Sequence, residues 1–321
     1  MNLDQTVRTF GRAMRERHGV RVHKVTVDAG FTCPNRDGSK GIGGCTFCNN
    51  RSFSPAEAER SVHEQVAAGR EAIRHARSGD RFLAYFQAYT NTYADVTALE
   101  FLSRTALAAD GVIGLSIGTR PDCVPEPVLD LLARLRDEGH EVWLELGLQS
   151  AFDATLARVN RGHGFSEYVD AIRRARSRGL QVCTHLILGL PGEDEFHWYA
   201  SLELVLAHGT DGLKLHPLHV VRNTRLANYW RAGRYQPISR ERYVEAAARM
   251  IVASPDDMVF HRLTGTARAP LLLAPDWCAE KWSVINAITT RVAQLRGDRA
   301  AMVTAAAHAA AATPLTESVA G

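Results

Sequence analysis

Three cysteines lie within sixteen residues near the amino end of the sequence. Cys45 and Cys48 are three positions apart, so a single turn can direct both sulfurs the same way, and Cys33 reaches them from the far side of a loop that holds four glycines. Three thiolates suit a soft metal centre, and the missing fourth ligand leaves a coordination position open for chemistry. These residues alone favour an iron–sulfur site no more than a zinc loop completed by a histidine such as His23 or His63.

The composition indicates a cytoplasmic protein with one large domain or two small ones. The 321 residues are 45% apolar, which is enough for a substantial core. The sequence has no apolar run long enough to span a bilayer and no signal pattern at its start, so we expect no membrane contact. In the reducing cytoplasm the six cysteines are expected to be thiols or metal ligands. The net charge of +3 permits an anionic partner without demonstrating one.

Lysine is rare in this sequence. Only Lys24, Lys40, Lys214 and Lys281 occur, which leaves thirty-four of the thirty-eight basic residues as arginine. A lysine retained in such a chain is a candidate for a task that needs a compact ammonium group rather than a planar guanidinium. Chance retention is the alternative for each of them.

Strand-like and helix-like segments alternate through most of the chain. Extended segments with β-branched or alternating residues are expected at 22–27, 82–86, 112–117, 142–148, 181–188 and 212–216. Helical periodicity is expected at 4–19, 56–77, 95–109, 125–138, 151–159, 165–178, 194–208, 239–253 and 282–295. Strands separated by helices imply βαβ crossovers. The sequence therefore predicts an α/β fold, a partial (β/α)6 barrel of parallel strands with an N-terminal helix and C-terminal helical additions.

The expected organisation is one domain with additions at both ends. An N-terminal helix occupies residues 1–20 and the barrel core residues 21–225. A helical extension over 226–296, with a short extended piece at 259–274, is expected to pack on the core. The alanine-rich tail over 297–321 is expected to be disordered.

The alternation within the strands predicts a polar interior. In the fourth strand, Leu144 and Leu146 face one way while Glu145 and Gln149 face the other. The apolar face would pack on the helices, and the polar face would line the lumen of the barrel. Charged groups in a lumen are costly unless they meet a ligand or each other, so the lumen is a predicted binding site at the carboxyl ends of the strands. The same alternation directs a further set of side chains into the lumen: Tyr85, Gln87, Cys183, His185, Lys214 and His216.

Several motifs together resemble the radical S-adenosylmethionine (SAM) superfamily, and within it the YhcC-like subfamily. They are AGFTCPNRDG (29–38), YFQAYTNTY (85–93), GTRPD (118–122), ELGLQS (145–150), NRGH (160–163), KLHPLH (214–219) and APDW (274–277). The eleven residues between Cys33 and Cys45 exceed the usual superfamily spacing, but this longer spacing is found in that subfamily. Some motifs also look like the radical SAM domain of the Elongator catalytic subunit, whose acyltransferase domain has no room in this chain. One departure is Asn223, where the resemblance leads us to expect glycine.

The resemblance implies a metal centre and a reaction. Cys33, Cys45 and Cys48 would ligate three irons of a [4Fe–4S] cluster, and the fourth iron would bind the amino and carboxylate groups of SAM. An electron from the reduced cluster would split a C–S bond of the sulfonium. The products would be methionine and a 5′-deoxyadenosyl radical, which abstracts hydrogen from the substrate. The protein would orient both cofactors and exclude water.

The resemblance and the strand positions also suggest residues that contact SAM. They are Gln87 with Thr90, Asn91 and Thr92 for the amino group, Ser116 and Arg120 for ribose and carboxylate, Glu145 and Gln149 for the ribose hydroxyls, Arg161 for the carboxylate, and Gly189 for the adenine. A structural role is the alternative for Arg120. His185 faces the same lumen, with a buried histidine bonded to the backbone as its alternative. Lys214 and His216 are the candidates for substrate contact.

The sequence is compatible with three functions. A radical enzyme that modifies a tRNA wobble uridine is favoured by the Elongator-like motifs and by the association of the subfamily with that modification. The same chemistry on a small metabolite or peptide is the second function, and a non-catalytic zinc-loop binding protein is the third. A radical enzyme also needs a reductant such as a flavodoxin or ferredoxin. The sequence does not indicate an oligomeric state.

Overall fold

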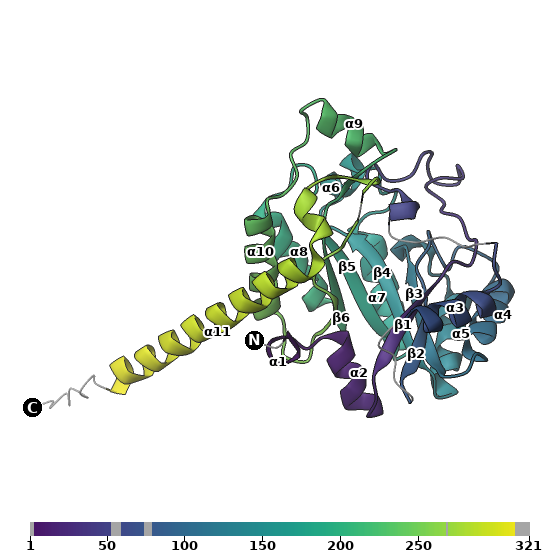
Figure 1. Ribbon diagram of the computed structural model, residues 1–321, viewed down its shortest axis with the longest axis horizontal. Coiled ribbons are helices and arrows are strands. Elements are labelled where there is room, and N and C mark those ends of the chain that lie inside the picture. The colour runs from purple at the N-terminus through teal and green to yellow at the C-terminus, as the bar shows by residue number, and fades with distance from the viewer. Residues whose placement is uncertain (1–2, 53–58, 74–78, 268, 312–321) are drawn as a thin grey trace, which may run out of the picture.

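The computed structural model describes residues 3–52, 59–73, 79–267 and 269–311. Its main element is a parallel sheet of seven strands in the order β1-β2-β3-β4-β5-β6-β8, which curls into a half-barrel with helices packed around the outside (Figure 1). The strands are β1 (Val22–Val27), β2 (Arg81–Phe86), β3 (Val112–Thr119), β4 (Glu141–Gln149), β5 (Gln181–Leu188), β6 (Gly212–Pro217) and β8 (Val259–Arg262). The six predicted strands and their parallel arrangement are confirmed.

Helices follow the strands where they were predicted, and one short helix at Arg225–Arg231 was not predicted separately. They are α3 (Val62–Ala72), α4 (Val96–Leu107), α5 (Glu126–Asp137), α6 (Asp153–Arg158), α7 (Phe165–Ser177), α8 (Glu195–Ala207), α9 (Arg225–Arg231) and α10 (Arg240–Ala253). Parts of the predicted helix 56–77 fall on residues 56–58 and 74–77, which lie outside the described residues. In the described ranges, no helix is long and apolar enough to cross a membrane.

The amino-terminal segment forms two helices where one was predicted. α1 (Leu3–Thr6) and α2 (Phe10–His18) are separated at Thr9, whose side chain accepts a hydrogen bond from the backbone amide of Arg12 at 3.1 Å and so caps α2. Thr9 also forms a parallel bridge to Phe260 of β8, which requires extended backbone at that point. The bridge at this break therefore attaches the amino-terminal segment to the edge strand β8 of the sheet.

Residues beyond the predicted end of the core at 225 also contribute to the main sheet. The extended piece expected at 259–274 contains two strands, and the first of them, β8, pairs with β6 in the main sheet. The second, β9 (Leu272–Ala274), pairs antiparallel with β7 (Val220–Val221). The carboxyl-terminal part of the chain thus supplies a strand of the barrel in addition to helices.

Residues 297–311, which belong to the tail expected to be disordered, lie within a helix of the described structure. α11 (Lys281–Ala311) continues as one helix that projects away from the body of the protein (Figure 1). Alanine has the highest helix propensity of all residues, so an alanine-rich segment can continue a helix that packing has started. Residues 312–321 lie outside the described structure.

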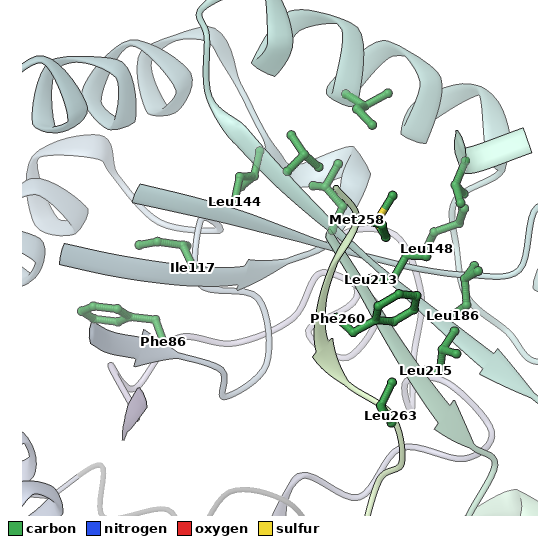
Figure 2. Packing of buried hydrophobic residues seen from close by; sticks show 14 of the residues in the cluster. Phe86, Ile117, Leu144, Leu148, Leu186, Leu213, Leu215, Met258, Phe260 and Leu263 are labelled. Carbon is green, nitrogen blue, oxygen red and sulfur yellow. The ribbon is translucent and has the colours of Figure 1, made fainter. Parts of the chain in front are cut away.

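The sheet buries both of its faces, as expected for parallel strands. On the outer face the predicted alternation is confirmed, because Leu144, Leu146 and Leu148 pack into the core beneath the helices. Figure 2 shows this layer, which includes Phe86, Ile117, Leu144, Leu148, Leu186, Leu213, Leu215, Met258, Phe260 and Leu263.

The amino end of the lumen is closed by a second hydrophobic cluster. α2 lies across this end (Figure 1), where Phe10 and Met14 pack against Leu83, Trp143 and Cys183 from the inner face of the sheet. The Phe10 ring centroid lies 6.4 Å from that of Trp143. This packing excludes water from the bottom of the half-barrel and leaves the polar inner positions at the carboxyl ends of the strands.

Replacing Phe10 with alanine is expected to destabilise the fold by about 3–5 kcal/mol, because it opens a cavity at the closed end of the lumen. The matched variant Phe101→Ala removes a ring that is 70% exposed and should change stability by less than about 0.5 kcal/mol. Urea unfolding of the two variants measures the difference. Equal stabilities would show that α2 does not close the barrel.

Candidate active site

One cavity opens at the carboxyl ends of the strands and is lined from both ends of the chain. The cysteine loop after β1 forms part of its wall, and residues of β5, β6 and β8 form another part. Most of the predicted site residues line it: Cys33, Cys45, Cys48, Gln87, Thr90, Arg120, Gln149, Arg161, His185 and His216. The structure therefore brings together side chains that are up to 183 positions apart in the sequence, from Cys33 to His216.

The cysteine loop is held in tight turns. The carbonyl of Cys33 accepts hydrogen bonds from the amides of Arg36 (2.8 Å) and Asp37 (3.2 Å), and the amide of Cys48 donates to the carbonyl of Cys45 (3.1 Å). All three cysteines are free thiols. The side chain of Arg36 donates to the carbonyl of Cys48 at 2.8 Å, which places a guanidinium beside the loop.

Donor groups surround the sulfur of Cys45. The guanidinium of Arg161 lies 3.5 Å from Cys45 Sγ, and the amide nitrogen of Asn35 lies 3.8 Å from the same atom. Such donors stabilise sulfur in its thiolate form, which is the form that ligates metal. Neither His23 nor His63 lines the cavity, and the His23 ring bonds to Asp80 at 2.9 Å near the start of β1. The three thiols thus fit an iron–sulfur cluster better than a zinc site completed by either histidine.

Beneath the cavity, Glu145 is completely buried and receives four hydrogen bonds. Its Oε1 accepts from Lys24 Nζ and Ser116 Oγ, both at 2.5 Å. Its Oε2 lies 2.7 Å from His185 Nε2 and accepts a short hydrogen bond from Lys214 Nζ. Burial opposes ionisation, but the ammonium groups of Lys214 and Lys24 hold the pKa of Glu145 well below its ordinary value.

Lys214 lies under an aromatic ring and not on the cavity wall. Its Nζ is 4.1 Å from the centroid of the Tyr85 ring and donates to the Tyr85 hydroxyl at 2.8 Å. Burial lowers the pKa of Lys214 to about 7, although Glu145 works against that fall. The predicted contact of Lys214 with substrate therefore has no support in this geometry, because its ammonium group is shared between Tyr85 and Glu145.

Ser116 and Glu145 were predicted to contact the ribose of SAM, and the structure gives them another role. Neither residue lines the cavity, and both carboxylate oxygens of Glu145 are already bonded. The rarity of lysine now has an explanation for two of the four, since Lys24 and Lys214 both place a compact ammonium group on one carboxylate.

Arg120 and Arg161, the two arginines predicted to contact SAM, differ in their hydrogen-bond partners. Arg120 is held in a two-point ion pair with Asp122 at 2.9 and 3.0 Å and also donates to the carbonyl of Arg161, so its structural alternative is favoured. Arg161 bonds the Gly147 carbonyl at 2.5 Å, but its buried Nε has no hydrogen-bond partner among the described residues. Arg161 therefore remains the better candidate for a carboxylate.

Thr90 is better placed for the predicted contact with SAM than Asn91 or Gly189. The buried Thr90 hydroxyl has no partner within the described ranges and lies on the cavity wall. The Asn91 amide donates to the Gly118 carbonyl at 2.7 Å. Gly189 is outside the cavity lining, and its φ of +90° together with the close approach of Ile238 (3.1 Å from an added Cβ) explains the glycine without an adenine contact.

Asn223, where glycine was expected, has a φ of 62°. Asparagine tolerates this left-handed conformation better than most residues with a side chain, so the loop after β7 keeps a glycine-like backbone.

Sequence reasoning missed three polar groups near this cavity. His261 lies 2.9 Å from Lys24 Nζ below it, and Arg262 and His219 line it. His219 stood in the KLHPLH motif, but no role was predicted for it. His261 and Arg262 belong to β8, whose pairing with β6 leaves no signal in the periodicity of so short a strand.

The parallel half-barrel and the cysteine-lined cavity define a class of iron–sulfur enzymes, and comparison with known families confirms it. Residues 33–205 match the Radical SAM superfamily, and residues 210–294 match the Radical_SAM C-terminal domain. The chain belongs to the radical SAM superfamily, whose enzymes use a [4Fe–4S] cluster together with SAM.

Within that superfamily, the chain is similar over most of its length to Protein YhcC of Escherichia coli. The two are 49% identical over 284 residues, which cover 88% of this chain and 91% of YhcC. YtqA of Bacillus subtilis is 36% identical over 89% of each chain. Elongator complex protein 3 of Schizosaccharomyces pombe is 31% identical over 50% of this chain and 29% of its own length.

Solved structures agree on the fold. The archaeal Elp3 of Methanocaldococcus infernus superposes with a TM-score of 0.62 at 18% identity, covering 83% of this chain and 62% of that one. Methylornithine synthase (PylB) superposes with a TM-score of 0.50 at 16% identity, covering 80% and 77%. At these identities the likeness extends to the fold alone.

Replacing Glu145 with glutamine is expected to lower stability by about 3–5 kcal/mol, because two buried ammonium groups lose their counter-charge. Glu138→Gln is the matched control, since it breaks a surface pair with Arg104 and should have little effect. Thermal and urea unfolding measure both variants. Wild-type stability in Glu145→Gln would show that the carboxylate does not hold the sheet together.

Proposed function

We propose that this chain reductively cleaves SAM at a [4Fe–4S] cluster held by Cys33, Cys45 and Cys48, and directs the resulting radical chemistry to a wobble uridine of tRNA. The observation that carries the first part is that three free thiols line one cavity with the guanidinium of Arg161 next to Cys45. When bound, the cluster supplies the electron that breaks the C–S bond of SAM. The chain itself belongs to a superfamily of such enzymes.

The residues of this chain would bind and orient the reactants. Arg161 Nε and the Thr90 hydroxyl have no hydrogen-bond partner in the part of the chain that the structure describes. Arg161 would donate to the carboxylate of SAM, and Thr90 would bond a polar group of the same molecule. Gln87 and Gln149 also lie on the cavity wall and are proposed contacts of SAM. The hydrophobic floor around Trp143 and the buried Glu145 network keep water from entering behind the reactants.

The mouth of the cavity supports an RNA substrate. Tyr89 is 40% exposed on the cavity wall, and the guanidinium of Arg36 lies 5.6 Å from the centroid of its ring. Arg225, which is exposed apart from a hydrogen bond to the Gly44 carbonyl, adds a second cation beside the cysteine loop. Exposed aromatic rings and arginines are the groups with which proteins stack unpaired bases and hold phosphates. The partial similarity to Elongator complex protein 3 points in the same direction.

We further propose that a flavodoxin or ferredoxin donates the electron, since a one-electron reductant is needed for every cleavage. Ile42 of the cysteine loop is 82% exposed and offers an apolar contact for such a donor.

Cys48→Ser is expected to lose the visible absorbance of the cluster and the formation of 5′-deoxyadenosine after anaerobic reconstitution with iron and sulfide. Cys123→Ser is the matched control, because Cys123 is buried and lies outside the cavity lining. Dithionite-driven assays with chromatographic detection of 5′-deoxyadenosine compare the two variants. Full activity in Cys48→Ser would remove that cysteine from the ligand set, and zinc without SAM cleavage would favour a binding protein.

Deleting the gene is expected to remove a modification from the wobble uridine of tRNA, and the wild-type gene but not Cys48→Ser should restore it. Mass spectrometry of nucleosides from purified tRNA measures this change. An unchanged nucleoside profile, with 5′-deoxyadenosine still formed by the purified enzyme, would contradict the tRNA assignment and favour a small metabolite or peptide as substrate.

A further inference from the structure

Arg262 lies on the cavity wall and has no counter-charge among the described residues. It is the last residue of β8 and lines the cavity, yet it makes no hydrogen bond or ion pair with any described residue. The other arginines of the wall are engaged: Arg36 with the Cys48 carbonyl, Arg120 with Asp122, and Arg161 with Gly147 and Cys45. A guanidinium that lines a cavity and has no partner among the described residues is available to bind an anionic ligand.

The charges around Arg262 do not balance. In the sheet it lies beside Lys214, its register partner on β6. The carboxylate of Glu145 accepts a hydrogen bond from Lys214, and it also accepts one from Lys24. Two ammonium groups thus share this carboxylate, and no carboxylate of the described residues pairs with Arg262. Since the guanidinium is partly buried on the cavity wall and has no carboxylate partner among the described residues, it would attract an anion bound next to it.

Neutral polar groups complete the same wall. His216 lies on the cavity wall and makes no hydrogen bond within the described chain, and burial holds its pKa well below the ordinary value, with Arg262 adding to the effect. Thr266 contributes a hydroxyl on the same wall. Gly265 lets the backbone approach closely, since an added Cβ would lie 2.8 Å from His216 Nδ1 and 3.0 Å from His219 Cε1. A guanidinium, an imidazole and a hydroxyl can together donate to several oxygens of one group.

We propose that Arg262, His216 and Thr266 bind an oxyanion of the substrate, a phosphate or a carboxylate. The inference rests on the proposed function, because it places the substrate in the cavity that holds SAM. The planar guanidinium matches the two-oxygen edge of either anion. The site is separate from the one proposed for the carboxylate of SAM, since Arg161 lies against Cys45 and Arg262 on β8. A neutral substrate would leave Arg262 without its counter-charge.

Binding measurements test the site with defined ligands. The anaerobically reconstituted enzyme, with SAM present, is titrated calorimetrically with uridine 5′-monophosphate, uridine and succinate at constant ionic strength. For the anion that the site takes, Arg262→Gln should raise the Kd at least about tenfold, which corresponds to about 1.4 kcal/mol. Arg262→Lys should keep part of the affinity. Arg173→Gln, at a side chain that is 73% exposed on α7, should leave the Kd unchanged.

The pattern of affinities identifies the source of the oxyanion. Binding of the monophosphate but not of uridine or succinate, lost in Arg262→Gln, supports a nucleotide phosphate. Binding of succinate with the same dependence supports a carboxylate.

Three results would overturn the proposal. They are equal anion binding by wild type and Arg262→Gln, no measurable binding of either anion, and a loss of SAM affinity in Arg262→Gln as large as the loss of anion affinity. Cluster absorbance and circular dichroism show that each variant is folded. If the wild-type enzyme forms no 5′-deoxyadenosine, the proposed function fails on its own, and the calorimetric result for Arg262 still stands.

Discussion

One buried carboxylate connects nearly every strand of the half-barrel. Glu145 of β4 accepts from Lys24 of β1, Ser116 of β3 and Lys214 of β6, and it also contacts His185 of β5. Two further strands are connected indirectly, through the bond of Lys214 to Tyr85 of β2 and of Lys24 to His261 of β8. Because a lone charge in this interior would be costly, the strands are held where these partners can reach the carboxylate.

The lumen is layered around this network. Below it, the apolar cluster of Phe10, Met14 and Trp143 closes the amino end and keeps the charges dry. Above it, the cavity holds the cysteines on one part of its wall and Arg262 on another. This arrangement of layers suits radical chemistry. The reactive groups face a cavity that is closed to water at its amino end and open to the substrate at the other.

Local patterns in the sequence were sufficient for the strands and for the direction of their side chains. Period-two alternation placed Glu145 and Gln149 on the inner face, and the structure confirms this. Alternation gives the direction of a side chain but not its partners, so Glu145 was taken for a ribose ligand when it is the centre of an ion network. For Arg120 the sequence left a contact with SAM and a structural role open, because its pairing with Asp122 depends on the conformation of a loop.

The sequence by itself determined the order of strands and helices, the polar lumen, the cysteine loop and the resemblance to a superfamily, because these depend on residue types at short spacing. The tertiary structure decided what depends on long-range pairing. β8 joins β6 across more than forty residues and brings Arg262 and His261 to the lumen. The fold also decided which charged groups neutralise one another and which is left for a ligand, since charge balance in a buried space is set by the distances between strands.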